Sequence, residues 1–162
     1  PAIEKIVQVG VRDFCEEEIT RSAGLWKRIK QFRSDAIKHG LYTHGRVWGS
    51  YVEEIVDALP TKDVYVTIDM DGFDPKLCPN TGTPVPGGLE YDEFLYLIHE
   101  MVVGGKRIIG FDICETGVAE KTIDATCYDT DVAAHLLWKM SCYALWSQQK
   151  NPKKGTDVDS LD

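Results

Sequence analysis

Apolar residues gather in three short runs that are typical of buried β-strands. The runs cover residues 5–11, 64–68 and 107–113, and they are rich in valine and isoleucine. In the last two runs, apolar side chains would occupy both faces of the strand, which indicates a parallel sheet covered by helices on both sides. The pattern therefore predicts an α/β fold with three layers (αβα) and a mainly parallel sheet.

Segments with helical periodicity separate these strands, as expected for right-handed strand–helix–strand crossovers. We predict helices over residues 21–39, 50–59, 91–103 and 130–146. The second of them has Ser50 at its start and Glu53 three residues later, which is the spacing of a capping box, and it stops before Pro60. Ligands of such sheets collect beyond the carboxyl ends of the strands, so chemistry is expected just after Ile68 and Ile113.

The composition of the chain argues against several classes of protein. The chain has 162 residues and a net charge of −8, without the clustered positive charge that nucleic-acid binding requires. No apolar run is long enough to span a bilayer, and the five cysteines form no C-x-x-C pair. We expect one cytoplasmic domain over residues 1–147 with reduced thiols, no nucleic-acid or membrane partner, and a flexible polar tail over residues 148–162.

Three aspartates follow the second strand within six residues. Asp69 and Asp71 stand two positions apart, so in extended backbone they would point to the same side. Two carboxylates at a strand end are suitable oxygen ligands for a divalent cation. A solvated turn is the simpler alternative, because Asp and Gly are common in turns.

Two other motifs can be compared with this segment. An EF-hand loop starting at Asp69 is excluded, because Asp74 and Asn80 occupy the positions that require glycine and glutamate. A phosphotransferase with Asp69 as its nucleophile also begins with strand-Asp-x-Asp, although Phe73 is unusual for that class. This interpretation stays open as an alternative.

A longer stretch points to a specific family. Residues 66–89, VTIDMDGFDPKLCPNTGTPVPGGL, closely resemble the signature of the ureohydrolase (arginase/agmatinase) family. Residues 110–115, GFDICE, resemble a later strand motif of that family, and residues 7–13, VQVGVRD, resemble an earlier strand. The resemblance extends to about Trp146.

The resemblance implies an arginase-like fold and hydrolysis of a small guanidino substrate with release of urea, in polyamine or arginine metabolism. It implies two Mn²⁺ ions bridged by a hydroxide, with Asp69 and Asp71 among their ligands. Glu115 would pair with the guanidinium through two hydrogen bonds, and Thr83 would lie near that carboxylate and the substrate. An agmatine-like substrate is favoured over arginine, and a homo-oligomer is expected.

The chain departs from the family in one respect. The Gly-Gly-Asp-His and Asp-Ala-His-x-Asp segments, which carry the family's other metal ligands, are absent from residues 1–162. His39, His44, His99 and His135 have no metal-ligand spacing, and Cys78 and Cys114 are interpreted as packing residues. We therefore expect the C-terminal half of a ureohydrolase, inactive without the missing N-terminal half. A non-catalytic assembly module of the same fold is the alternative.

Overall fold

The structure is a computed structural model that describes residues 3–18, 28–118 and 127–149. Its elements, in chain order, are β1 (Ile6–Val9), β2 (Ile29–Phe32), α2 (Ser34–Thr43), α3 (Trp48–Asp57), β3 (Asp63–Asp69), the 3-10 turn η1 (Met70–Gly72), α4 (Tyr91–Val103), β4 (Arg107–Cys114) and α5 (Tyr128–Ser147). Among these helices, none is both long and apolar enough to cross a membrane. Of the predicted tail, only residues 148 and 149 are described.

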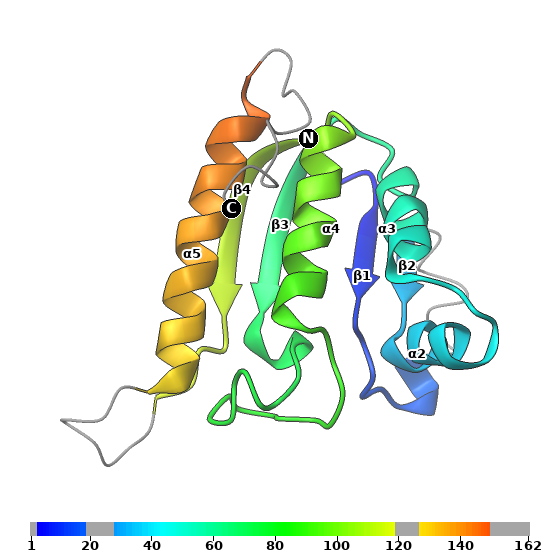
Figure 1. Ribbon diagram of the computed structural model, residues 1–162, viewed down its shortest axis with the longest axis vertical. Helices are drawn as coiled ribbons and strands as arrows, with labels where there is room; N and C mark the ends of the chain where they lie inside the picture. The colour runs from blue at the N-terminus through cyan, green and yellow to red at the C-terminus, as the bar shows by residue number, and fades with distance from the viewer. Residues whose placement is uncertain (1–2, 19–27, 119–126, 150–162) are drawn as a thin grey trace, which may run out of the picture.

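The strands form two parallel pairs. β1 pairs with β2, β3 pairs with β4, and no pairing joins β1 to β3 in the described residues. Figure 1 shows all four strands pointing the same way, in the order β4, β3, β1, β2 across the molecule. The segments that leave β1, β3 and β4 therefore emerge at one edge, where α/β folds place their ligands. The predicted parallel α/β architecture is confirmed.

The helices cover one face of these strands. In Figure 1, α3, α4 and α5 lie on the same side of the strands. Burial along β3 alternates accordingly, with Ile68 buried and Tyr65 59% exposed, and Ile109 of β4 is 60% exposed. The predicted cover on both faces is thus not found within the described residues. A run of β-branched residues indicates that both faces of a strand are covered, but it does not show whether the same chain or another polypeptide covers the second face.

Two helix predictions need correction. Residues 29–32 of the predicted helix 21–39 form β2, α2 begins only at Ser34, and residues 19–27 lie outside the described part. The four residues of β2 are too few to show a period, and their pairing with β1 decides their conformation. The predicted cap at Ser50 is also wrong, because α3 begins at Trp48 after Val47 and the Ser50 hydroxyl donates to the Val47 carbonyl at 2.8 Å.

The hydrophobic core anchors the exit of β3. The helix predicted over residues 91–103 has the same bounds as α4. The buried face of α4 consists of Phe94, Leu97, Ile98, Met101 and Val102. Immediately after β3, Met70 is fully buried and Phe73 packs edge-on against Phe94 with ring centroids 5.3 Å apart. The backbone on either side of Asp71 is therefore fixed by two buried apolar side chains.

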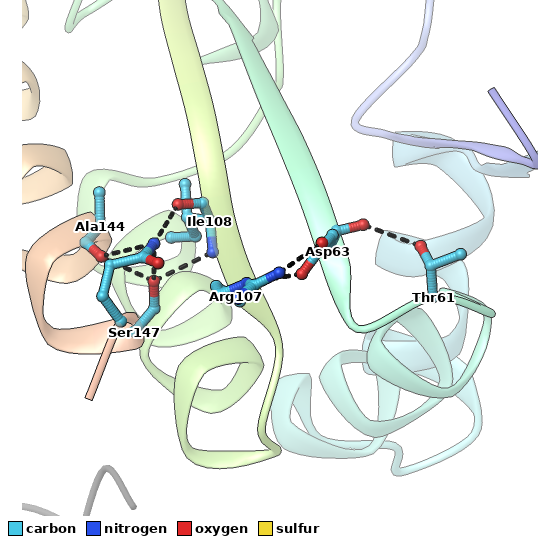
Figure 2. Close-up of polar contacts among 7 residues, drawn as sticks. Thr61, Asp63, Arg107, Ile108, Ala144 and Ser147 are labelled. Carbon is cyan, nitrogen blue, oxygen red and sulfur yellow. Dashed lines mark hydrogen bonds and ion pairs between the residues drawn. The ribbon is translucent and has the colours of Figure 1, made fainter. Parts of the chain in front are cut away.

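The opposite, amino-terminal end of β3 and β4 is tied together by polar contacts (Figure 2). The Arg107 guanidinium donates two hydrogen bonds to the Asp63 carboxylate, at 2.7 and 2.6 Å. The Ile108 amide donates to the Ser147 hydroxyl at 3.0 Å, and Gln148 donates to the Ile108 carbonyl at 2.8 Å. The end of α5 thus satisfies backbone groups of β4.

Replacing Ser147 with alanine should lower the free energy of unfolding by about 1–2 kcal/mol, because the buried Ile108 amide would lose its acceptor. Ser141→Ala is the matched control: the exposed Ser141 hydroxyl bonds to the Leu137 carbonyl within its own helix, and its loss should change stability by less than about 0.5 kcal/mol. Chemical denaturation of both variants measures the difference. Equal stability losses would contradict the assigned role of Ser147.

Candidate functional site

Asp69 and Asp71 come together where β3 ends. Asp69 is the last residue of the strand, and its carboxylate accepts a hydrogen bond from the Asp71 amide at 3.3 Å. This contact caps the 3-10 turn η1, which contains Asp71. The two acids are therefore adjacent, as predicted, but Asp71 lies in a helical turn and not in the extended backbone that the prediction assumed.

The electrostatics of this strand end are unfavourable. Partial burial of the carboxyl group raises the pKa of Asp69 above its ordinary value, and the negative charges of Asp71 and Glu115 raise it further, against the lowering effect of the Asp71 amide. The carboxylates at the ends of β3 and β4 thus repel one another. A bound cation would relieve this repulsion.

Glu115 adopts a strained backbone conformation. It follows the last residue of β4, and its φ of 57° is the sole positive value among the described non-glycine residues. The buried Thr81 hydroxyl donates to the Glu115 carbonyl at 2.8 Å, which holds this conformation. Left-handed backbone at a side chain other than glycine is costly, and such residues cluster at functional sites.

The loop between η1 and α4 connects the two strand ends. The Thr83 hydroxyl donates to the Asp71 carboxylate at 2.8 Å. The loop also passes the Glu115 side chain, because a Cβ built on Gly82 would lie 3.1 Å from a Glu115 carboxylate oxygen. Thr83 was expected near Glu115 and the substrate. Its hydroxyl contacts Asp71, and the residue before it, Gly82, lies next to the Glu115 carboxylate.

The same loop is fixed to α5 by a buried carboxylate that the sequence analysis did not identify. Asp129 is fully buried and accepts two hydrogen bonds from Asn80, from the backbone amide at 2.9 Å and from the side-chain amide at 2.8 Å. Asp129 also lies in the first turn of α5, where the helix dipole favours a negative charge. Its partner is 49 positions away in sequence, so no local pattern reveals the pair.

The two cysteines near the site differ. Cys78 is fully buried and donates to the Met70 carbonyl at 3.0 Å, and burial raises the pKa of its thiol to about 11. This environment agrees with the predicted packing role and keeps the thiol protonated at neutral pH. Cys114 is exposed and donates to the Asp112 carboxylate at 3.1 Å, so the packing role predicted for it is wrong.

Comparison with known proteins identifies the family. Residues 1–142 match the arginase family. The chain belongs to this family. A relative from Thermus thermophilus, named N(1)-aminopropylagmatine ureohydrolase, is 34% identical over 68% of this chain and 33% of its own length. Arginase-1 of Mus musculus is 32% identical over 94% of this chain and 45% of its own length.

Solved arginase-family structures confirm the fold. The agmatine ureohydrolase of Thermoplasma volcanium superposes with a TM-score of 0.65 and 28% identity, over 86% of this chain and 42% of that one. The chain therefore spans between a third and a half of the length of these relatives.

The carboxylates of this arginase-family chain fit part of a divalent-cation site. Asp69 and Asp71 supply hard oxygen donors in a region of excess negative charge. In residues 3–18, 28–118 and 127–149, however, no three His, Cys, Asp or Glu side chains lie close enough together to hold a metal ion. The negative charge of Glu115 raises the pKa of Asp69, but in the described residues Glu115 does not form a three-residue metal-binding group with Asp69 and Asp71.

The four histidines contact groups other than these acids. His39 and His44 stack edge-on against each other, His99 pairs with Glu100, and the His135 ring bonds to the Asp131 carbonyl within α5. Within the described residues, the histidine contacts thus give no support for a histidine ligand beside Asp69 and Asp71.

Proposed function

We propose that this chain contributes part of the active site of a manganese-dependent ureohydrolase, which releases urea from a small guanidino substrate. The observation that carries the proposal is the placement of Asp69, Asp71 and Glu115 at the ends of two adjacent parallel strands, at one edge of the sheet. Membership of the arginase family favours this chemistry over a phosphotransferase that uses Asp69 as its nucleophile.

Each acid has a distinct proposed role. Asp69 and Asp71 would provide two of the ligands for a pair of Mn²⁺ ions. When bound, the ions supply a nucleophile from water near neutral pH. Glu115 would accept two hydrogen bonds from the planar guanidinium and so orient the substrate, and its fixed backbone reduces the freedom lost on binding.

Thr83 supports this site by holding Asp71. Its hydroxyl occupies one acceptor position on the Asp71 carboxylate, which restricts the rotation of that group. The carboxylate keeps its remaining lone pairs for a metal ion. The role proposed for Thr83 is therefore to orient a ligand.

The remaining ligands would come from further polypeptide, which we propose to be the N-terminal half of the fold. β1 and β3 are each paired along one edge only in the described residues, and Tyr65 and Ile109 leave one face of the strands exposed. Unpaired edges and apolar sheet faces call for a covering segment. We also propose a homo-oligomer, which the exposed Leu137, Trp138 and Leu145 on α5 support.

Among substrates, an agmatine-type compound is proposed before arginine. The relatives from Thermus thermophilus and Thermoplasma volcanium are named for agmatine or its aminopropyl derivative, and the murine relative is named arginase. The part of the substrate beyond the guanidinium would be recognised by residues outside the described contacts.

Urea release by the complete protein, with and without Mn²⁺, tests the proposal on agmatine, N(1)-aminopropylagmatine and arginine. Glu115→Gln should lower kcat/KM about 100-fold, because losing one partner of a charge-assisted pair costs about 3 kcal/mol. Glu53→Gln, an exposed substitution on α3, is the control and should be neutral. Absence of urea from all three substrates would favour the non-catalytic module, and Mg²⁺-dependent phosphatase activity would favour the phosphotransferase.

A further inference from the structure

The Arg12 side chain joins three separate segments at the edge of the strands. It leaves the segment after β1, is partly buried, and donates only to backbone carbonyls. Its Nη2 reaches the carbonyls of Asp71 at 2.7 Å, Phe73 at 3.1 Å and Val85 at 2.7 Å. Its Nε also reaches Val85 at 3.1 Å, and its Nη1 reaches Gly10 at 3.4 Å.

This bonding pattern differs from that of three other arginines in the described residues. Arg33, Arg46 and Arg107 each pair with a carboxylate. Arg12 has no carboxylate partner in the described residues, and its guanidinium is surrounded by carbonyl oxygens instead. A cationic fork is rigid and forms stronger hydrogen bonds than a neutral donor does. The contacts of Arg12 therefore fix backbone, with no ion pair involved.

The fixed backbone is that of the proposed metal ligand. Arg12 holds the carbonyl of Asp71 directly. Through Val85 it also holds the loop that carries Thr83, whose hydroxyl bonds to the Asp71 carboxylate. Asp71 is thus constrained at its main chain and at its side chain by contacts that depend on one guanidinium.

Gly87 packs beside the Arg12 side chain. It has a φ of +90°, which favours glycine, and a Cβ built there would make ordinary van der Waals contact with Arg12 Cδ, at 3.6 Å. The contacts with Asp71, Phe73 and Val85 span 59 to 73 sequence positions, and β1 and β3 are not paired directly. Within the described residues, Arg12 therefore links the exits of these two strands through hydrogen bonds.

We propose that Arg12 is a positioning residue that sets the orientation of the Asp71 carboxylate for metal binding. This inference rests on the proposed function, since it assumes that Asp71 is a ligand. Groups that orient a ligand typically change metal affinity 10- to 100-fold when they are removed. Arg12→Met should therefore weaken Mn²⁺ binding by about 10- to 100-fold.

The test is a titration of the complete, metal-free protein with Mn²⁺, in which electron paramagnetic resonance measures the free ion. Arg12→Met removes all the hydrogen-bond donors of the side chain. Arg12→Lys keeps the charge but loses the forked guanidinium, so its Mn²⁺ affinity should lie between those of the wild type and Arg12→Met. Arg28→Met is the matched control, because in the described residues the Arg28 side chain donates to one exposed carbonyl, that of Ile3, at 3.2 Å. Its Mn²⁺ affinity should equal that of the wild type. Thermal unfolding of each metal-free variant shows that titrations are made on folded protein.

The outcomes separate the two proposals. If the wild type binds Mn²⁺ and folded Arg12→Met binds it equally well, the role of Arg12 is wrong and the proposed function stands. If Arg12→Met is unfolded, folded Arg12→Lys decides: wild-type affinity in that variant overturns the inference, and weakened affinity supports it. If the wild type itself does not bind Mn²⁺, the proposed function fails and the inference fails with it.

Discussion

Asp71→Asn should remove Mn²⁺-dependent urea release from the complete protein while leaving the metal-free fold intact. Asparagine retains an oxygen that can accept the hydrogen bond from Thr83, so the local geometry is preserved. It loses the negative charge that a divalent cation needs from its ligands. We expect a loss of activity of at least about 100-fold, beyond the range seen when only a supporting group is removed.

The stability of this variant provides a second and more specific readout. The charges of Asp71 and Glu115 both act unfavourably on Asp69 in the absence of metal. Removing one of them relieves repulsion, so the metal-free variant should unfold at the same temperature as the wild type or at a higher one. Gains in stability with loss of function are typical of functional sites.

Urea assays and thermal unfolding in chelator measure the two effects. Asp57→Asn is the matched control, because Asp57 is an exposed aspartate at the end of α3 and should leave both quantities unchanged. Wild-type activity in Asp71→Asn would contradict the ligand role of Asp71. A large fall in metal-free stability would instead show that Asp71 is structural.

Gly88→Ala should destabilise the fold by about 3 kcal/mol or more. Gly88 has a φ of +108°, and a Cβ there would lie 2.5 Å from the Phe73 carbonyl carbon and oxygen and 2.8 Å from the Asp74 amide. These are backbone atoms, and they are held in place. The Asp74 amide donates to the Leu89 carbonyl at 3.0 Å, and the Leu89 amide donates to the Gly72 carbonyl at 3.1 Å.

The contacts at Gly88 also bear on function. Moving Phe73 and Leu89 apart would shift the loop that carries Thr83 away from Asp71. The Gly88→Ala protein should therefore lose activity as well as stability. This effect differs from that of Asp71→Asn, which should leave the metal-free protein stable.

Gly105→Ala separates conformational strain from steric overlap. Gly105 also has a positive φ, of +84°, but a Cβ there meets no atom within 4 Å. Its replacement should cost only about 1–2 kcal/mol, the typical penalty for left-handed backbone. Chemical denaturation of the two variants measures the difference, and equal costs would mean that the close approach to Phe73 has no energetic consequence.

Much of the fold was predictable from the sequence because the relevant signals are local. The strands that became β3 and β4 were recognisable from continuous apolar runs, and the helix over residues 91–103 from its period and its two terminal glycines. The capping box that begins this helix uses Glu90 and Glu93. The predicted box at Ser50 has the same spacing but does not form, because spacing alone does not fix where a helix starts.

The sequence predicted the acidic residues of the candidate site, but it did not predict the residues that hold them in position. Asp69, Asp71 and Glu115 follow apolar strands, and carboxylates at strand ends are a local signal. Arg12 and Asp129 carry no such signal, since the partners through which they fix the loop lie 49 to 73 positions away. The contact of Thr83 with Asp71 depends on the path of a whole loop, so the sequence did not reveal this hydrogen bond.

By itself, the sequence determined the alternation of strands and helices, the acidic strand ends and the resemblance to the arginase family. Tertiary structure alone decided that residues 29–32 pair as a strand, that Glu115 takes a left-handed backbone, and that one arginine holds the exits of β1 and β3 together. The physical reason is that burial and local propensity act over a few residues. Pairing, strain and long-range hydrogen bonds exist only once distant segments have been brought into contact.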